Sequence, residues 1–287
     1  MKYQGFCLLS LFALLVACQP AQDPHVETWK PLFNGENLAG WTPKFTGYPT
    51  GENWRNTFKV MDSTLLVDYT EHDTFAGNFG HLFYAPEDFG YYKIRAVYRF
   101  EGAQVEKGPG WAFRNNGLML HCQSPQSMGL EQDFPVSVEV QLLGADSTHS
   151  RSTANLCTPG TSVTMNGNIH RPHCINSSSA DFLGDQWVTV TVEVYGDSLF
   201  RHLVNGEEVM TYSLPYFDGG AIASFDSSLY RAGQPIKRGY IAIQAESHPT
   251  RFKSIEVLPL EGCMDPQALN YKAYYVKSRP ESCQYSD

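Results

Sequence analysis

The chain has 287 residues, of which 42% are hydrophobic and 13% aromatic, and its formal net charge is −9. This negative balance argues against a nucleic-acid-binding protein, because phosphate contacts need clustered lysine and arginine side chains. The length suits one large β domain or two smaller domains, and it is enough to bury a sizeable core.

The N-terminus has the pattern of an export signal. Lys2 precedes an apolar run over residues 6–16, which is too short to cross a bilayer as a helix. The run ends in Leu-Val-Ala before Cys18 and resembles the lipobox of bacterial lipoproteins; an ordinary signal peptide with a chance cysteine is the alternative. We expect residues 1–17 to be removed and Cys18 to carry a lipid. Residues 18–28 would then tether the protein to the membrane of the bacterial cell envelope, at the outer membrane or facing the periplasm.

Short strand patterns separated by glycine, proline, asparagine and aspartate fill most of the remaining chain. They cover residues 58–67, 91–100, 117–123, 136–144, 187–195, 198–204, 207–212, 239–248 and 251–258. Asn205-Gly206 between two alternating runs indicates a tight hairpin. Almost no segment has helical periodicity, so the sequence predicts an all-β sandwich or jelly roll.

Three of these strands are apolar on one face and polar on the other. The second face would carry Glu139 and Gln141 in residues 136–144, His121 and Gln123 in residues 117–123, and Gln244, Glu246 and His248 in residues 239–248. Successive side chains of a strand point to opposite faces, so each set should lie on one side of a sheet. We interpret the three polar faces as one floor, a candidate sugar-binding site.

The cysteines suggest disulfides, as is usual in exported proteins. Apart from the signal peptide and Cys18, the chain has five: Cys122, Cys157, Cys174, Cys263 and Cys283. Cys122 is the expected free thiol, since it falls on the apolar face of its strand. The neighbours in sequence, Cys157 with Cys174 and Cys263 with Cys283, are the expected pairs, although spacing alone leaves other pairings open.

Residues 31–41 (PLFNGENLAGW) resemble the opening of the 3-keto-disaccharide hydrolase family, formerly a domain of unknown function, DUF1080. The segments around Asn116, Glu139, Trp187 and Gln244 also fit, and the resemblance covers residues 29–260. It implies a concanavalin A-like jelly-roll β-sandwich whose concave face binds a carbohydrate. It also implies cleavage of 3-oxo glycosides at the bond to the aglycone.

Residues 261–287 form a separate segment. Their Gly-Cys-Met-Asp-Pro, Asn-Tyr and Ser-Cys-Gln-Tyr pieces resemble a short cysteine-bounded motif at the ends of some exported bacterial proteins. We expect a small disulfide-closed C-terminal appendix.

The predicted catalytic residues are Glu139, His121 and Glu246. A 3-oxo group acidifies the C2 proton of a pyranose, so a base can remove it while the C1 substituent leaves with the help of an acid. Glu139 is the candidate base, and His121 the candidate acid or metal ligand. A solvent-facing Glu139 paired with a lysine or arginine is the alternative.

Seven residues are candidates for substrate binding. The amides of Gln141, Gln244 and Gln123 both donate and accept hydrogen bonds, which suits sugar hydroxyls. Arg95 could stabilise an enolate or form an ion pair, and Trp111, in a loop-like stretch, could stack on a sugar face. The remaining two candidates are Asn116 and His173. Asn116 belongs to residues 114–116, which precede the His121 strand and could form a loop at the edge of the site.

A divalent metal ion is compatible with the pattern, since it would polarise the 3-oxo group. Its ligands would be His121, Glu139 and either Glu246 or His248, although the spacing does not require a metal. His170 and His173, in a His-x-x-His pattern beside Cys174, invite a zinc interpretation. That interpretation fails if Cys174 is in a disulfide.

The sequence therefore predicts an exported, lipid-anchored β-sandwich enzyme that acts on 3-oxo glycosides by base-assisted elimination or hydrolysis. Two alternatives stay open: a non-catalytic carbohydrate-binding module of the same fold, and a direct glycoside hydrolase using Glu139 with Glu246.

Overall fold

Two long strands, β6 (Tyr91–Phe100) and β13 (Val188–Tyr195), organise the computed structural model, which describes residues 23–286. Each strand buries every second side chain, and the two pair in antiparallel register from Val188 opposite Tyr98 to Tyr195 opposite Tyr91. The buried valines of β13 and the buried aromatics of β6 face a second sheet across the main hydrophobic core. The predicted signal peptide and the predicted lipidation site at Cys18 lie outside the described residues.

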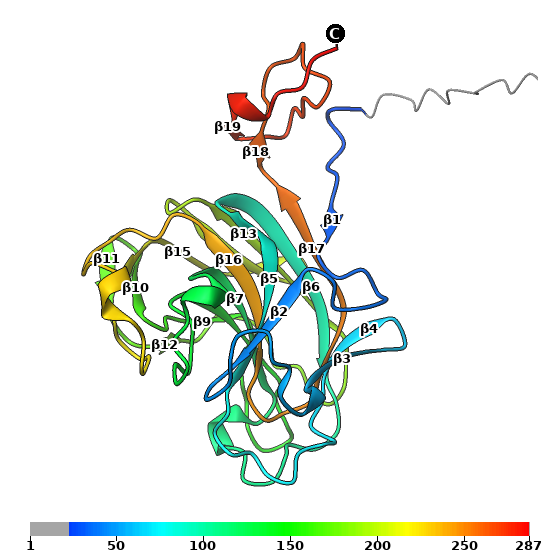
Figure 1. Ribbon diagram of the computed structural model, residues 1–287, viewed down its shortest axis with the longest axis vertical. Coiled ribbons are helices and arrows are strands. Elements are labelled where there is room, and N and C mark those ends of the chain that lie inside the picture. The colour runs from blue at the N-terminus through cyan, green and yellow to red at the C-terminus, as the bar shows by residue number, and fades with distance from the viewer. Residues whose placement is uncertain (1–22, 287) are drawn as a thin grey trace, which may run out of the picture.

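The two sheets form the layers of a sandwich (Figure 1). The first has the order β11 (Asn168–His170), β10 (Thr161–Met165), β15 (Glu207–Phe217), β14 (Phe200–Val204), β13, β6, β17 (Thr250–Pro259), β4 (Thr64–Val67), β3 (Phe58–Met61), and β1 (Lys30–Pro31) also pairs with β17. The second has the order β12 (Cys174–Ile175), β9 (Asn155–Cys157), β8 (Val138–Leu143), β7 (Asn115–Cys122), β16 (Gly239–Ala245), β5 (Gly80–Phe89), β2 (Trp41–Phe45). Helical structure between residues 23 and 286 is limited to short 3-10 turns: η1 (Trp54–Asn56), η2 (Gly110–Ala112), η3 (Pro125–Ser127), η4 (Ser227–Leu229) and η5 (Pro280–Ser282).

The predicted hairpins are present. β14 and β15 are joined at Asn205-Gly206, whose φ values of 50° and 92° suit the two positive-φ positions of a tight hairpin turn. The turn between β3 and β4 uses Asp62 and Ser63, also at positive φ. The predicted all-β sandwich is therefore confirmed.

The second sheet is covered on both faces around β7, whose eight residues are all buried. One face packs against the first sheet. We call the opposite face, which points away from the core, the site face. Loops that follow η2 and β8 lie over it, and the predicted polar floor belongs to it.

A small C-terminal unit stands off the end of the sandwich (Figure 1). Its strands β18 (Glu261–Gly262) and β19 (Lys277–Ser278) pair in parallel, and the Cys263–Cys283 disulfide closes it. The backbone N–H of Ala273 donates to the carbonyl of Pro24 at 2.9 Å, so the unit also contacts the start of the described chain. The predicted cysteine-bounded appendix is confirmed.

The predicted pairing of Cys157 with Cys174 and the predicted free thiol are also confirmed. Cys157 and Cys174 form a disulfide, while Cys122 is free and buried. No helix within residues 23–286 is long and apolar enough to span a membrane.

Candidate active site

A row of polar side chains crosses the site face from one edge of the second sheet toward the other. The strand registers align Lys44, His81, Gln244, Gly117, Gln141 and Asn155. Asn155 donates from Nδ2 to Oε1 of Gln141 at 3.2 Å. The row brings together side chains that lie far apart in the sequence, as cross-strand pairing does in any sheet.

A cavity of about 460 Å³ opens on the site face, and we call it the inner cavity. Trp111 and Phe134 supply aromatic walls, and the Cys157–Cys174 disulfide with His173 forms another side. The complete lining is Trp111, Asn115, Phe134, Glu139, Gln141, Leu143, Arg151, Cys157, His173, Cys174 and Glu246. A mainly apolar cavity with a few converging polar groups is typical of a small-molecule site.

Gly117 lets two functional groups approach each other on the floor of this cavity. A Cβ atom at this position would lie 2.7 Å from Oε1 of Glu139 and 2.5 Å from Oε1 of Gln244. Any larger residue would occupy the space into which both side chains project. The glycine therefore allows Glu139 of β8 and Gln244 of β16 to converge across β7.

Both carboxyl groups of the inner cavity hold protons more tightly than usual. Burial raises the pKa of Glu139 to about 8, an effect that the neighbouring Gln244 amide opposes in part. Burial also raises the pKa of Glu246 well above its ordinary value; the charge of Glu139 raises it further, and Arg151 opposes this rise. Raised carboxyl pKa values in a cavity are characteristic of proton-transfer sites.

Several buried polar atoms on the site face have no hydrogen-bond partner within the described residues. They are both amide atoms of Gln244, Oε2 of Glu246, Oδ1 of Asn115 and both ring nitrogens of His81. Buried polar groups are normally satisfied, because leaving one unpaired costs about 1–3 kcal/mol. Atoms left unpaired in and next to a cavity are suited to binding a polar ligand.

Arg151 lies between the Trp111 wall of the inner cavity and the side that carries Glu246. Its guanidinium donates to the backbone carbonyl of Phe113 and, at 3.0 Å, to that of Trp111. Burial lowers the pKa of Arg151, while Asp146 and Glu246 act to raise it. Arg151 thus places a positive charge near Glu246 and positions the Trp111 segment.

The prediction that His121 shares the polar floor is wrong. Between Met119 and Cys122, β7 has one more residue than its partner β16, and His121 has a φ of 50°. This bulge turns the His121 ring into the sandwich core, where its centroid lies 5.1 Å from that of Phe200. Burial lowers its pKa to about 4. The bulge also moves Cys122 to the face opposite the one predicted, beside Met119.

Three predicted substrate-binding residues have structural partners instead. Gln123 exchanges hydrogen bonds with Gln132 and accepts from the N–H of Val136. Asn116 donates from Nδ2 to the carbonyl of Gln244 at 2.8 Å, so it positions the strand that carries Gln244. Arg95 lies on the first sheet, where it pairs with Glu256 at 2.8 Å and stacks on Trp29.

The predicted metal ligands are not brought together. His121 lies in the core, Glu139 lies in the inner cavity, and His248 packs between Phe100 and Phe113, with its pKa lowered by burial to about 4. Among residues 23–286, three potential ligands cluster closely only at Cys157, His173 and Cys174, and both cysteines are in the disulfide. The zinc interpretation fails for that reason.

The structure places Glu139, Gln141, Glu246, His173 and Trp111 in the inner cavity, as predicted, with Gln244 at its floor. Trp111 is 53% exposed, as a stacking surface requires.

Sequence reasoning missed His81, Lys44, Phe134 and Arg151. Alternation in residues 80–84 could have placed His81 on the site face, but nothing in the sequence links the loop residue Arg151 to it.

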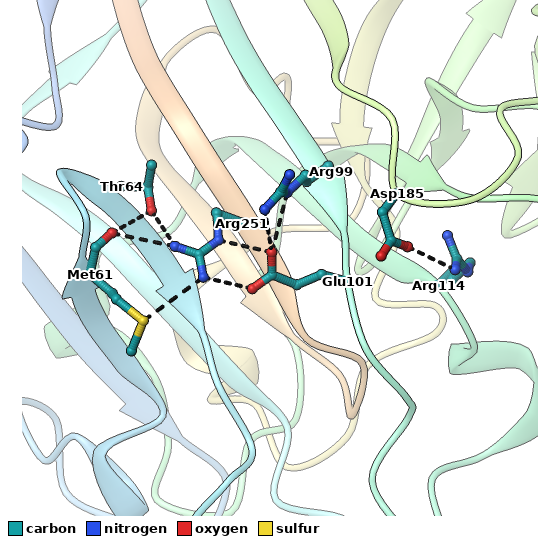
Figure 2. A network of polar contacts seen from close by, with 7 residues as sticks. All are labelled: Met61, Thr64, Arg99, Glu101, Arg114, Asp185 and Arg251. Atoms are coloured by element: carbon teal, nitrogen blue, oxygen red, sulfur yellow. Dashed lines mark hydrogen bonds and ion pairs between the residues drawn. The ribbon is translucent and has the colours of Figure 1, made fainter.

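A second cavity, of about 520 Å³, lies apart from these residues and is rich in acidic groups. Two of its carboxylates form close ion pairs: Lys59 contacts Asp68 at 2.5 Å, and Glu101 accepts from Arg99 and Arg251, as Figure 2 shows for Glu101. These ion pairs hold the pKa values of Asp68 and Glu101 below their ordinary range, despite burial. This cavity therefore lacks the raised carboxyl pKa values of the inner cavity.

Comparisons with known proteins bear on the family and the fold of the chain. No curated protein sequence matches the chain. A proposed glycosyl hydrolase of Parabacteroides distasonis has a similar fold, with 17% identity and a TM-score of 0.46 over 80% of this chain and 93% of that chain. A galectin-like protein from Bacillus subtilis has 13% identity and a TM-score of 0.47 over 80% and 94%. Likeness at this level of identity concerns the fold alone. Residues 28–258, most of the chain, match the 3-keto-alpha-glucoside-1,2-lyase-like domain, and the protein therefore belongs to that family.

Proposed function

We propose that this protein cleaves 3-oxo glycosides by base-assisted elimination in the inner cavity. The observation that carries the proposal is a pair of buried carboxyl groups, Glu139 and Glu246, both with raised pKa values. Membership of the 3-keto-alpha-glucoside-1,2-lyase-like family supports the same chemistry.

The reaction starts with the proton on C2, which the adjacent C3 carbonyl makes acidic. A carboxylate takes this proton, a C1=C2 double bond forms, and the C1–O bond to the leaving group breaks. The leaving oxygen receives a proton from an acid. The products are a conjugated 2-hydroxy enone and the free alcohol; later addition of water to the enone would complete a net hydrolysis.

We assign Glu139 as the base and Glu246 as the acid. The charge on ionised Glu139 raises the pKa of Glu246, so Glu246 keeps its proton when Glu139 has lost its own. The amide of Gln244, which lies beside Glu139, and the positive charge of Arg151 are suited to stabilising the enolate oxygen. Glu246 thereby takes the acid role that the sequence suggested for His121.

Gln141 is proposed to bind the sugar through its amide, and Trp111 to contact the substrate at the edge of the inner cavity through its exposed ring. The protein would act in the bacterial cell envelope, held there by the lipid on Cys18. The exposed Trp111 also favours the alternative of a non-catalytic carbohydrate-binding module.

The test compares 4-nitrophenyl glucoside, its 3-oxo form and methyl 3-oxo-glucoside as substrates. Glu139→Gln should lower kcat on both oxidised substrates by about 100-fold or more. Glu246→Gln should affect the methyl substrate much more than the 4-nitrophenyl one, since 4-nitrophenolate leaves without protonation. Glu36→Gln, at an exposed position, is the matched control.

Three results would overturn the proposal. Cleavage of the unoxidised glucoside with retained dependence on both carboxylates would indicate a direct glycosidase. Sugar binding without turnover of any substrate would indicate a binding module. Full activity of Glu139→Gln would remove Glu139 from the mechanism.

A further inference from the structure

Another cavity opens beside the inner cavity, and the two share Trp111 and Arg151. We call it the outer cavity. Its volume is about 640 Å³, and its lining is Gly110, Trp111, Phe113, Asp146, His149, Ser150 and Arg151. A glycoside whose sugar occupies the inner cavity can extend its C1 substituent past the shared residues. The outer cavity is therefore placed to receive a leaving group.

The polar groups of the outer cavity are largely satisfied within the protein. Oδ1 of Asp146 accepts from the N–H groups of Thr148 and His149, at 2.7 and 2.8 Å, and from the Thr148 hydroxyl. The ring of His149 also contacts this carboxylate. The Arg151 guanidinium is directed to two backbone carbonyls. This contrasts with the inner cavity, where Gln244 and Glu246 have unpaired atoms.

Two aromatic rings, Trp111 and Phe113, also line the outer cavity. Trp111 stacks on Phe79 at a centroid distance of 5.8 Å and stays 53% exposed. Phe113 is half-buried, and its ring is held by an edge contact with His248 at 5.3 Å. Rings fixed in this way lose little conformational entropy when a ligand binds. They favour offset or edge contacts with another planar ring.

We infer that the outer cavity binds an aromatic leaving group, so that the preferred substrates are 3-oxo glycosides of planar phenols rather than 3-oxo disaccharides. The inference rests on the proposed elimination. A second sugar would bring several hydroxyl groups to a surface where Asp146 and the Arg151 guanidinium already have hydrogen-bond partners. A phenol brings one ring and one oxygen, and that oxygen is the atom bonded to C1.

The first test fills the outer cavity without changing the inner one. Ser150 lines the outer cavity, and Ser147, on the same loop, does not; both are exposed. Ser150→Trp should lower the ratio of kcat/KM for 2-naphthyl to methyl 3-oxo-glucoside by about 10-fold, equivalent to about 1.4 kcal/mol. Ser147→Trp should leave the ratio unchanged. Each ratio compares the same two substrates, so the difference in basicity between their leaving groups cancels when wild type and variants are compared.

The second test needs no turnover. Binding of 2-naphthol to the full chain is followed by saturation-transfer NMR, and Ser150→Trp, but not Ser147→Trp, should weaken it. Binding with this pattern but no turnover of any 3-oxo glycoside would overturn the elimination alone. Turnover of the methyl substrate without 2-naphthol binding would overturn the aromatic subsite alone. Higher kcat/KM for a 3-oxo disaccharide than for the naphthyl substrate would also overturn it.

Discussion

Glu139 and Gln244 reach each other across Gly117. The two side chains come from β8 and β16, which lie on either side of β7, and a Cβ atom on the intervening glycine would meet both side-chain oxygens at less than 3 Å. Glu139, the proposed base, and the Gln244 amide can therefore lie next to each other because Gly117 has no side chain. Their proximity depends on the register of three strands, not on nearness in sequence.

Replacing Gly117 with alanine should damage the site more than the fold. The added methyl group would displace Glu139 and Gln244 from the cavity floor, so kcat/KM on a 3-oxo glycoside should fall by at least about 10-fold. Gly90→Ala is the control, because its Cβ would find ordinary contacts at 3.5 Å. Steady-state kinetics and thermal unfolding measure the two effects. Unchanged kcat/KM in Gly117→Ala would contradict this account.

Glu139 should make the stability of the protein depend on pH. Its pKa in the folded protein, about 8, exceeds the ordinary value of 4.5, so the folded state binds this proton more tightly than the unfolded chain. The free energy of unfolding should therefore decrease as pH rises from about 4.5 to about 8, and this contribution should then level off. Glu139→Gln lacks the group, so its Tm relative to wild type should increase between pH 5 and pH 8, by roughly 3–10 °C. A constant Tm difference across this range would show that the pKa is not raised.

The Cys157–Cys174 disulfide should support substrate binding as well as stability. It forms part of the inner cavity and holds the adjacent His173. Replacing both cysteines with serine should cost about 2–4 kcal/mol of stability and raise KM. Replacing Cys263 and Cys283 should leave KM unchanged, because that disulfide lies in the C-terminal unit. If both double variants had the same KM, the Cys157–Cys174 disulfide would make no contribution to substrate binding.

His121→Met should retain kcat/KM within about 3-fold of wild type. The ring lies in the core, both of its nitrogens lack partners within the described residues, and removing a buried unpaired polar group relieves a cost. Tm should therefore stay equal or rise. A loss of about 100-fold in kcat with an unchanged Tm would restore His121 to the catalytic machinery.

Much of the site could be predicted from local sequence. On β8, core-facing residues alternate with Glu139 and Gln141. The same alternation on β16 gives Gln244, and it continues past the end of the strand to Glu246. Period-two alternation is a property of the strand itself, so it survives in the fold. The two disulfides also join the cysteines that are neighbours in the sequence, as expected.

Alternation predicted the wrong face for His121, because a β-bulge depends on how two strands pair and not on the sequence of one strand. Gly239 lies so close to the bulge that a Cβ there would be 2.4 Å from the carbonyl carbon of His121. No pattern within residues 117–123 shows this packing, and one extra residue reverses every side chain that follows.

The sequence by itself determined the strands, the hairpins, the family and the polar face that carries Glu139 and Gln244, because these depend on the order of residues along one segment. Only the tertiary structure decided that Arg151 joins that face, that His121 turns into the core, that Arg95 lies on the other sheet, and that Gly117 leaves room for Glu139 and Gln244 to meet. Those placements depend on strand register and on loops that cross the sheet, and therefore on contacts between segments far apart in the chain.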